Sequence, residues 1–260
     1  MGKVSAKIFN LEGKSTGKLR LPTVFKTPVR PDVIKRAVVA IQSHRFQPQG
    51  RDVLAGMRTT AESLGVGLGI ARVARIKGRG QRAALIPFAV GGRPTHPPVV
   101  EKKIEKKIPR KEMRLALRSA VAATASKEKV SSRGHMIDDV RDFPLVVVDE
   151  IQSLKKTREV EKAFIQIGVW PDVYRVRESR KVRAGKGKRR GRKMKQAVGP
   201  LLVISENGGV VEAARNLPGV DIVKVSNLNV ELLAPGTHPG RLTVWTSSAV
   251  EKLNELFGEG

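Results

Sequence analysis

The chain has 260 residues, enough for one large domain or for one domain that carries a long insertion. Fifty lysines and arginines against 24 aspartates and glutamates give a formal net charge of +26, a self-repulsion that a polyanion would neutralise. A hydrophobic content of 40% excludes wholesale disorder, and the lack of cysteine excludes disulfides and thiolate metal sites. Nucleic acid is therefore the expected partner. No apolar run is long enough to cross a bilayer, so no membrane partner is expected and the expected location is the cytoplasm.

The first predicted elements are a strand and two helices. Residues 4–9 alternate between apolar and polar side chains, as a short strand does. Asp32 is expected to cap a helix, because the apolar residues that follow it recur at helical spacing. A second helix is expected over about residues 111–125 for the same reason.

From residue 145 onward, the pattern alternates between strands and helices. Strands are expected at 145–149, 172–176, 201–205, 221–225 and 242–246. Helices are expected at 157–167, at 210–216, and from a capping box of Ser248 and Glu251 to about residue 257. Such alternation predicts an α/β fold, a Rossmann-like three-layer sandwich with a mainly parallel sheet.

Residues 45–98 do not follow this pattern. They are rich in glycine and proline, and nine lysines and arginines face only two acids, Asp52 and Glu62. A stretch of this length without regular structure is functional, disordered or wrongly assigned, and the arginines between glycines favour function. We expect a globular body over residues 1–44 and 99–260, with 45–98 as a long extended internal loop.

A second basic segment covers residues 175–195. It holds twelve lysines and arginines and one acid, Glu178. Its glycines let the backbone approach phosphates, and its arginines offer forked contacts to them. The alternatives are a solvated charged loop or a localisation signal, but the density of cations favours contact with nucleic acid.

Three other chemistries find little support in the sequence. Residues 185–191 are a poor dinucleotide fingerprint, because the third glycine comes one residue late and no strand precedes the first. Asp149 and Glu150 follow an apolar strand, as in many NTPases, but the chain has no phosphate-binding loop. None of the four histidines shares metal-ligand spacing with another, although His96 could stack on a base or contact phosphate. No catalytic residue, metal site or cofactor is expected.

The order of several segments resembles that of the family of the fourth protein of the large ribosomal subunit, in its archaeal form. The segments that carry this resemblance are residues 21–32, 58–65, 95–98, 118–125, 133–135, 181–192, 233–236 and 239–243. They extend over essentially the whole chain, and they are specific when taken in order.

The resemblance implies a structural protein bound to large-subunit rRNA, beside other large-subunit proteins. Family members carry a long loop that lines a narrow part of the nascent-peptide exit tunnel, where it meets the nascent peptide. By position, the rRNA-binding residues would be Arg45, Arg51, Arg58, Arg72, Arg75, Lys77, Arg79, Arg82, Arg93, His96, Lys181, Arg183, Lys186, Lys188, Arg189, Arg190, Arg192 and Lys193. The tunnel-proximal residues would be Gly65, Gly67, Leu68, Gly69, Ile70 and Arg72.

Two other classes of function remain as alternatives. An RNA-modifying enzyme with a nucleotide-type cofactor would need a glycine-rich turn after its first parallel strand, and residues 149–153 supply none. A chromatin-type DNA binder would need a helix with a basic base-reading face, which no predicted helix carries.

Overall fold

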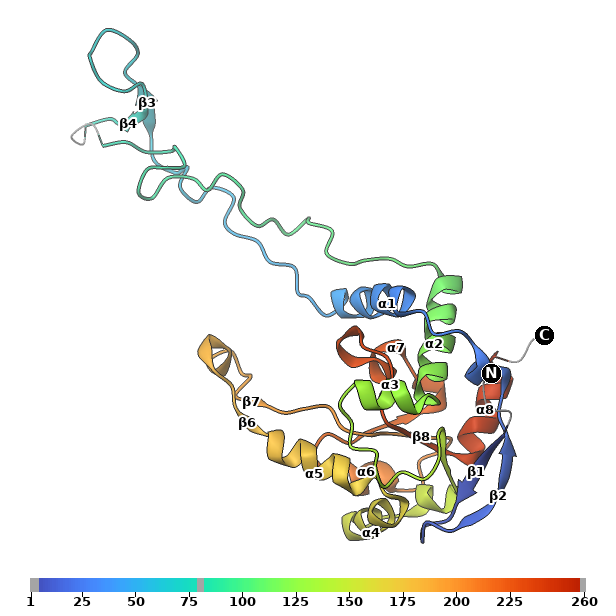
Figure 1. Ribbon diagram of the computed structural model, residues 1–260. Coiled ribbons are helices and arrows are strands. Elements are labelled where there is room, and N and C mark those ends of the chain that lie inside the picture. The colour runs from blue at the N-terminus through green and yellow to red at the C-terminus, as the bar shows by residue number, and fades with distance from the viewer. Residues whose placement is uncertain (1–4, 79–81, 258–260) are drawn as a thin grey trace. The chain divides into compact units, whose positions relative to one another are not determined.

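The computed structural model describes residues 5–78 and 82–257, and the chain divides into two compact units (Figure 1). The first unit, called the body, comprises residues 1–42 and 107–260. The second, called the insertion unit, comprises residues 43–106.

The body is built on a six-stranded sheet with the order β2-β1-β5-β10-β8-β9. Its strands are β1 (Ser5–Phe9), β2 (Ser15–Arg20), β5 (Leu145–Val147), β8 (Leu201–Ile204), β9 (Asp221–Lys224) and β10 (Thr243–Thr246). Only β2 runs antiparallel to its neighbour, so the prediction of an α/β fold with a mainly parallel sheet is confirmed. Every residue of β5, β8 and β10 is buried, as in central parallel strands covered on both faces.

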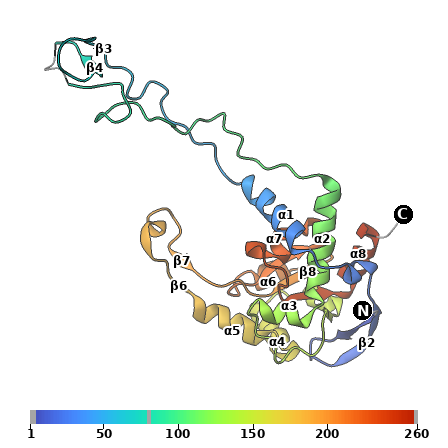
Figure 2. The ribbon, with the colours of Figure 1, turned by 45° about the horizontal axis from the view of Figure 1, so that its top comes forward.

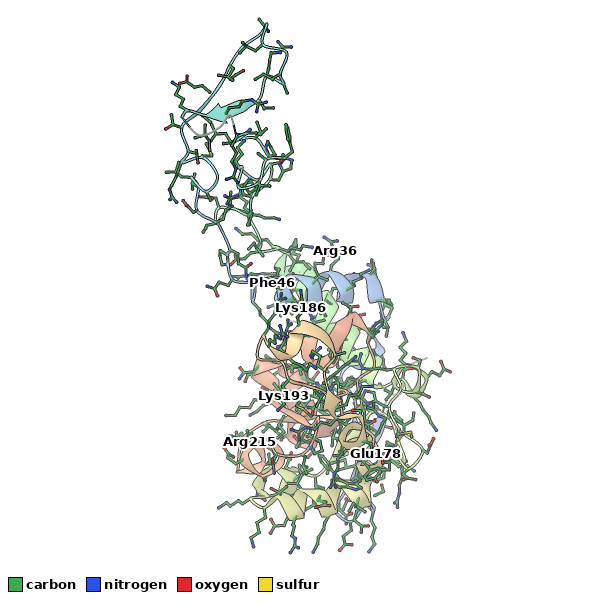
Figure 3. The ribbon with its side chains drawn as sticks, turned by 90° about the vertical axis from the view of Figure 1, so that its left-hand side faces the viewer. Arg36, Phe46, Glu178, Lys186, Lys193 and Arg215 are labelled. Atoms are coloured by element: carbon green, nitrogen blue, oxygen red, sulfur yellow. The ribbon has the colours of Figure 1, made fainter. Side chains whose placement is uncertain are left out.

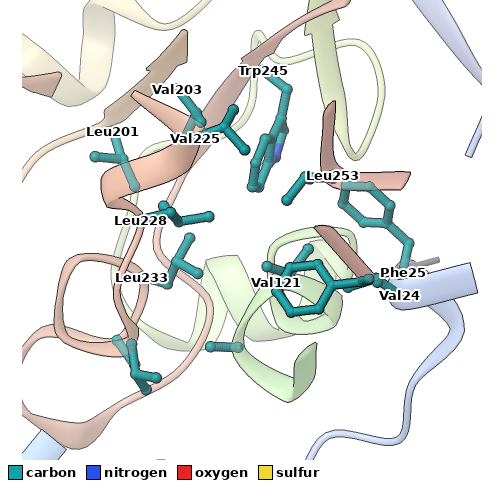
Figure 4. Packing of buried hydrophobic residues seen from close by; sticks show 14 of the residues in the cluster. Val24, Phe25, Val121, Leu201, Val203, Val225, Leu228, Leu233, Trp245 and Leu253 are labelled. Carbon is teal, nitrogen blue, oxygen red and sulfur yellow. The ribbon is translucent and has the colours of Figure 1, made fainter. Parts of the chain in front are cut away.

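Helices cover both faces of this sheet (Figure 2). The first apolar cluster receives residues from α1 (Pro31–Ser43), α2 (Arg110–Thr124), α7 (Val230–Leu233) and α8 (Ser247–Phe257). The second receives residues from α3 (Lys127–Ser132), α4 (Thr157–Ile167), α5 (Trp170–Ser179) and α6 (Val210–Ala214). In the first cluster, Phe25 meets Trp245 edge to face, with ring centroids 5.7 Å apart (Figure 4). The two clusters bury opposite sides of the same strands, which is why their residues alternate along the sheet.

Three local predictions are wrong. Residues 172–176 form the middle of α5 and not a strand, because Val169, Val173 and Val176 are buried at helical spacing. Asp32 does not cap α1: the helix begins at Pro31, and Asp32 lies in its first turn. The capping box is also absent, since α8 begins at Ser247 and the Ser248 hydroxyl bonds Asp149 instead. The helix at residues 157–167 is confirmed, and it ends at Gly168 in the left-handed conformation.

The insertion unit contains little regular structure. Two short strands, β3 (Ala61–Ser63) and β4 (Ala74–Ile76), pair antiparallel, and turns or irregular backbone make up most of the remainder. Gly56 has a φ of +76°, and a Cβ there would lie 2.4 Å from the carbonyl oxygen of Gly92. Two stretches of backbone therefore approach each other at a distance that only glycine permits.

Candidate nucleic-acid interface

The densest charge of the body lies on a short hairpin, residues 181–195, called the basic hairpin. Its two-residue strands, β6 (Lys181–Val182) and β7 (Met194–Lys195), pair antiparallel directly after α5 ends. The Arg183 N–H donates to the Lys193 carbonyl at 2.9 Å, which extends the ladder by one bond. Gly185 and Gly191 adopt positive φ with open space around them, so the chain turns back over few residues.

The side chains of the basic hairpin face solvent. Figure 3 shows Lys186 and Lys193 on this part of the body, above Arg215 in the view. The predicted residues that are exposed here are Lys181, Lys186, Lys188, Arg189, Arg190, Arg192 and Lys193, and Arg183 is half-buried. Within the described residues, no carboxylate forms an ion pair with any of these cations. The hairpin therefore carries its charge without internal neutralisation, and a polyanion would relieve the repulsion.

Charge is arranged differently in the insertion unit, where both acidic residues of the segment 45–98 form ion pairs. Asp52 pairs with Arg58 at 2.6 Å, and Glu62 pairs with Lys77 at 2.8 Å. The predicted rRNA-binding residues that are exposed are Arg45, Arg58, Arg72, Lys77, Arg82, Arg93 and His96, whereas Arg51 and Arg75 are half-buried. Arg79 lies outside the described residues. The paired side chains of Arg58 and Lys77 remain exposed, at 66% and 64%, so both cations stay on the surface.

The predicted tunnel-proximal residues lie in the irregular segment between β3 and β4. Gly65, Gly67, Leu68, Gly69 and Ile70 are all exposed, and the three glycines have positive φ. A Cβ added at any of these glycines would meet nothing within 4 Å. Their glycine character therefore serves the backbone conformation and not a close contact inside the insertion unit.

A buried polar cluster in the body was missed by the sequence prediction. The Asp172 carboxylate faces His135 Nδ1 at 2.9 Å and accepts from the Met136 N–H and from Arg175 Nε. Burial lowers the pKa of His135, although the neighbouring carboxylate opposes this. Burial alone would raise the pKa of Asp172, but its bonds with His135 and Arg175 lower it below the ordinary value. The cluster joins residues 133–136 to α5.

Arg133 continues this cluster toward the C-terminal segment. Its guanidinium donates to the carbonyl oxygens of Pro235 and His238, and burial lowers the pKa of Arg133 to about 10. A cavity of about 570 Å³ opens beside it, lined by Lys129, Arg175 and His238 among others. The segment at 133–135 thus has a structural use inside the body. In the sequence, these residues stood out only as one of the segments that carry the family resemblance.

Arg241 is a second missed residue. It is 1% exposed, and its guanidinium pairs with Asp221 at 2.5 Å. It also donates to the carbonyl oxygens of Gly199 at 2.8 Å and Leu232 at 3.0 Å. Arg241 is one of four basic residues after Pro200, and nothing in its local sequence marks it, because its partners Gly199 and Asp221 lie on other segments of the chain.

Other classes of site are not indicated by the described part of the chain. There, no group of three or more histidine, cysteine or acidic side chains is arranged to hold a metal ion. Likewise, no helix in residues 5–78 or 82–257 combines the length and apolar character needed to cross a membrane. Asp149, which follows an apolar strand as in many NTPases, bonds the start of α8 instead.

Comparison with known proteins finds similarity over nearly the whole chain. A model of the ribosomal protein L4/L1 family matches residues 19–256. Large ribosomal subunit protein uL4 of Methanopyrus kandleri is 52% identical over 260 aligned residues, covering 98% of this chain and 100% of the relative. The proteins of the same name from Archaeoglobus fulgidus and Methanosphaera stadtmanae are 53% and 49% identical, covering 97% and 99% of this chain and 99% and 98% of the relatives.

Proposed function

Because the chain belongs to the ribosomal protein L4/L1 family, we propose that it binds large-subunit rRNA and neighbouring proteins as a structural constituent of the large ribosomal subunit. This family consists of structural proteins and not of enzymes, so the alternative of an RNA-modifying enzyme is wrong. In this role the protein is located in the ribosome, in the cytoplasm.

The basic hairpin carries the proposal. Seven of its predicted lysines and arginines are exposed, and no described carboxylate pairs with them. The backbone glycines between them leave room for phosphates to approach. Such a surface binds the phosphate backbone of RNA, because each neutralised phosphate releases condensed counterions.

The insertion unit has a second part in the proposal. Its exposed arginines hold rRNA on both sides of β3 and β4, and residues 65–72 line the nascent-peptide exit tunnel. Supporting this is the contrast within the segment: residues 64–71 carry no charge, whereas arginines and lysines precede and follow them. A neutral, glycine-rich surface offers a passing peptide few attachment points.

The architecture of both units is part of the same proposal. The body is Rossmann-like in having helices on both faces of a parallel sheet, and two separate apolar clusters support this. Residues 45–98 are proposed to act as an extended internal loop, supported by their short strands and by their many exposed apolar side chains, such as Val53 and Val66. An extended segment of this kind is stabilised by the RNA that it contacts.

The salt dependence of RNA binding tests the main proposal. We expect the triple variant Lys186→Gln, Lys188→Gln, Arg190→Gln to bind an archaeal large-subunit rRNA transcript more weakly, with the salt slope reduced by about 2–3. A matched control removes three exposed lysines elsewhere: Lys18→Gln, Lys127→Gln and Lys162→Gln. Equal slopes for the two triple variants would overturn the role of the basic hairpin.

Crosslinking tests the tunnel proposal separately. A photoreactive amino acid replaces Leu68 or, as the control, the exposed Val53, and ribosomes that contain each variant translate a radiolabelled stalled peptide. We expect the peptide to crosslink at position 68 and not at 53. Crosslinking at neither position, in ribosomes that translate normally, would remove residues 65–72 from the tunnel wall.

A further inference from the structure

A cavity of about 590 Å³ lies beside α5, close in sequence to the basic hairpin but separate from it. Trp170 and Tyr174 of α5 line it together with Arg177. These residues are spaced by four and three positions, so they share one face of the helix. Its volume lies in the range of small-molecule and nucleotide sites.

Tyr174 lines this cavity, and packing inside the body does not account for its exposed ring. It is the single tyrosine of the chain, and it is 50% exposed. Its hydroxyl forms no hydrogen bond with another residue of the described ranges 5–78 and 82–257. An aromatic ring half open to solvent, with an apolar wall formed by Trp170 and Val173 beside it, offers a flat surface to a second ring.

The charges around the cavity favour an anion. Arg177, Arg180 and Arg215 line it, and Arg215 comes from the segment after α6 (Figure 3). Two carboxylates also line it, but Asp221 already pairs with the buried Arg241. The three arginines therefore outnumber Glu161, the other carboxylate, and the cavity carries an excess of positive charge.

Aromatic and cationic groups together select a particular ligand chemistry. Unpaired bases of RNA stack on aromatic rings and on guanidinium planes, whereas base-paired RNA offers only its grooves and backbone. We propose that this cavity binds one unpaired nucleotide of rRNA, with its base stacked on Tyr174 and its phosphate held by the surrounding arginines. The inference rests on the proposed rRNA binding and adds to it a site that recognises a base lying outside a helix.

The path of the chain from α5 into the basic hairpin favours an RNA nucleotide over an acidic peptide as the ligand of this cavity. α5 ends at Ser179 and the basic hairpin begins at Lys181, so RNA bound along the hairpin passes close to the end of the helix. The segment 194–199 returns from the hairpin and contributes Gln196 to the cavity wall. One RNA strand can therefore contact both features.

Substitution of Tyr174 tests the proposal. We expect Tyr174→Leu to weaken binding of an archaeal large-subunit rRNA transcript by about 5- to 100-fold, the range for loss of one stacked base. Because no phosphate contact is lost, the salt slope should remain that of the wild type, unlike that of the triple variant of the basic hairpin. Tyr174→Phe keeps the ring and should bind like the wild type. Ile165→Ala, which truncates an exposed side chain on α4, is the control for helix-surface changes.

Chemical probing of the RNA identifies the bound nucleotide. We expect at least one unpaired base to be protected by the wild type and by Tyr174→Phe, and to become reactive with Tyr174→Leu. Unchanged affinity and protection for a folded Tyr174→Leu variant would overturn the inference while leaving the salt result of the basic hairpin intact. A reduced salt slope for Tyr174→Leu would also overturn it, because the loss would then lie in phosphate contacts. Normal RNA binding with loss of a neighbouring protein from assembled subunits would assign the cavity to a protein partner.

Discussion

Asp149 Oδ1 accepts a hydrogen bond from the Ser248 backbone N–H at 3.0 Å and another from the Ser248 hydroxyl at 2.6 Å. The second carboxylate oxygen accepts from the Ser247 hydroxyl at 2.7 Å. Burial alone would raise the pKa of Asp149, but these bonds lower it below the ordinary carboxyl value. A carboxylate at the end of β5 thus caps a helix that begins about a hundred residues later.

Asp149→Ala is expected to lower the free energy of unfolding by about 1 kcal/mol, the usual value of a helix cap. Denaturant melts followed by circular dichroism measure the change. The control is Glu150→Ala, since Glu150 is exposed and lies next to the cap without joining it. If the two variants melt alike, the cap contributes little to stability.

Gly168→Ala is expected to destabilise the body by more than about 1–2 kcal/mol, the cost of a left-handed backbone alone. The added Cβ would also lie 2.3 Å from the Asp139 carbonyl oxygen, so the loop that faces α4 must move. Gly17→Ala in β2 is the matched control, because nothing lies within 4 Å of its Cβ position. A thermal melt that ranks the two variants equally would contradict the need for glycine at 168.

Arg241→Met is expected to lower the free energy of unfolding by about 2–3 kcal/mol, because it leaves buried carbonyl oxygens without a donor. Arg158→Met, on the exposed side of α4, removes the same charge and serves as the control. Equal urea midpoints for the two variants would show that the buried guanidinium is dispensable.

Acidification is expected to destabilise the body through His135. The folded-state pKa of His135 is lowered by burial, so below the ordinary histidine pKa of about 6.5 the unfolded chain binds the proton more tightly. The contribution of neutral His135 to the free energy of unfolding is therefore complete above that pH. It declines as the pH falls, by at most about 1.4 kcal/mol per pH unit. Melting temperatures between pH 7.5 and 5.5 measure this decline.

His135→Gln provides the comparison for the pH series. The amide keeps a donor for Asp172 but does not titrate in this range, so its melting temperature should change less between pH 7.5 and 5.5. If the melting temperatures of the wild type and of the variant fall equally with pH, the pH dependence belongs to other groups.

Much of the body was predictable from local patterns, and the predictions that were wrong have physical causes. The spacing of apolar residues and Gly168 predicted α4 correctly, because both signals are local. Residues 172–176 were wrongly predicted as a strand, because the window was too short to show the helical period. Val169, Val173 and Val176 are buried at spacings of four and three positions, which is the pattern of a helix face.

The candidate interface was predictable where it depends on charge alone. The basic hairpin is visible in the sequence as a run of lysine, arginine and glycine. The aromatic cavity was not, because the spacing of Trp170, Tyr174 and Arg177 indicates a shared face only once α5 is known to be a helix. Arg215 joins them through the tertiary fold, and its position in the sequence gives no hint of this.

The position of β10 has a consequence for how this protein is made. β10 lies between β5 and β8 in the sheet, yet it follows both of them in the sequence. During synthesis, the half-sheet of β1 and β5 and the half-sheet of β8 and β9 therefore cannot be joined before residues 243–246 exist. The basic hairpin leaves the ribosome before that moment, so its cations are exposed on a chain whose central sheet is still open. Completion of the sheet is thus a late event, and it depends on residues 243–246.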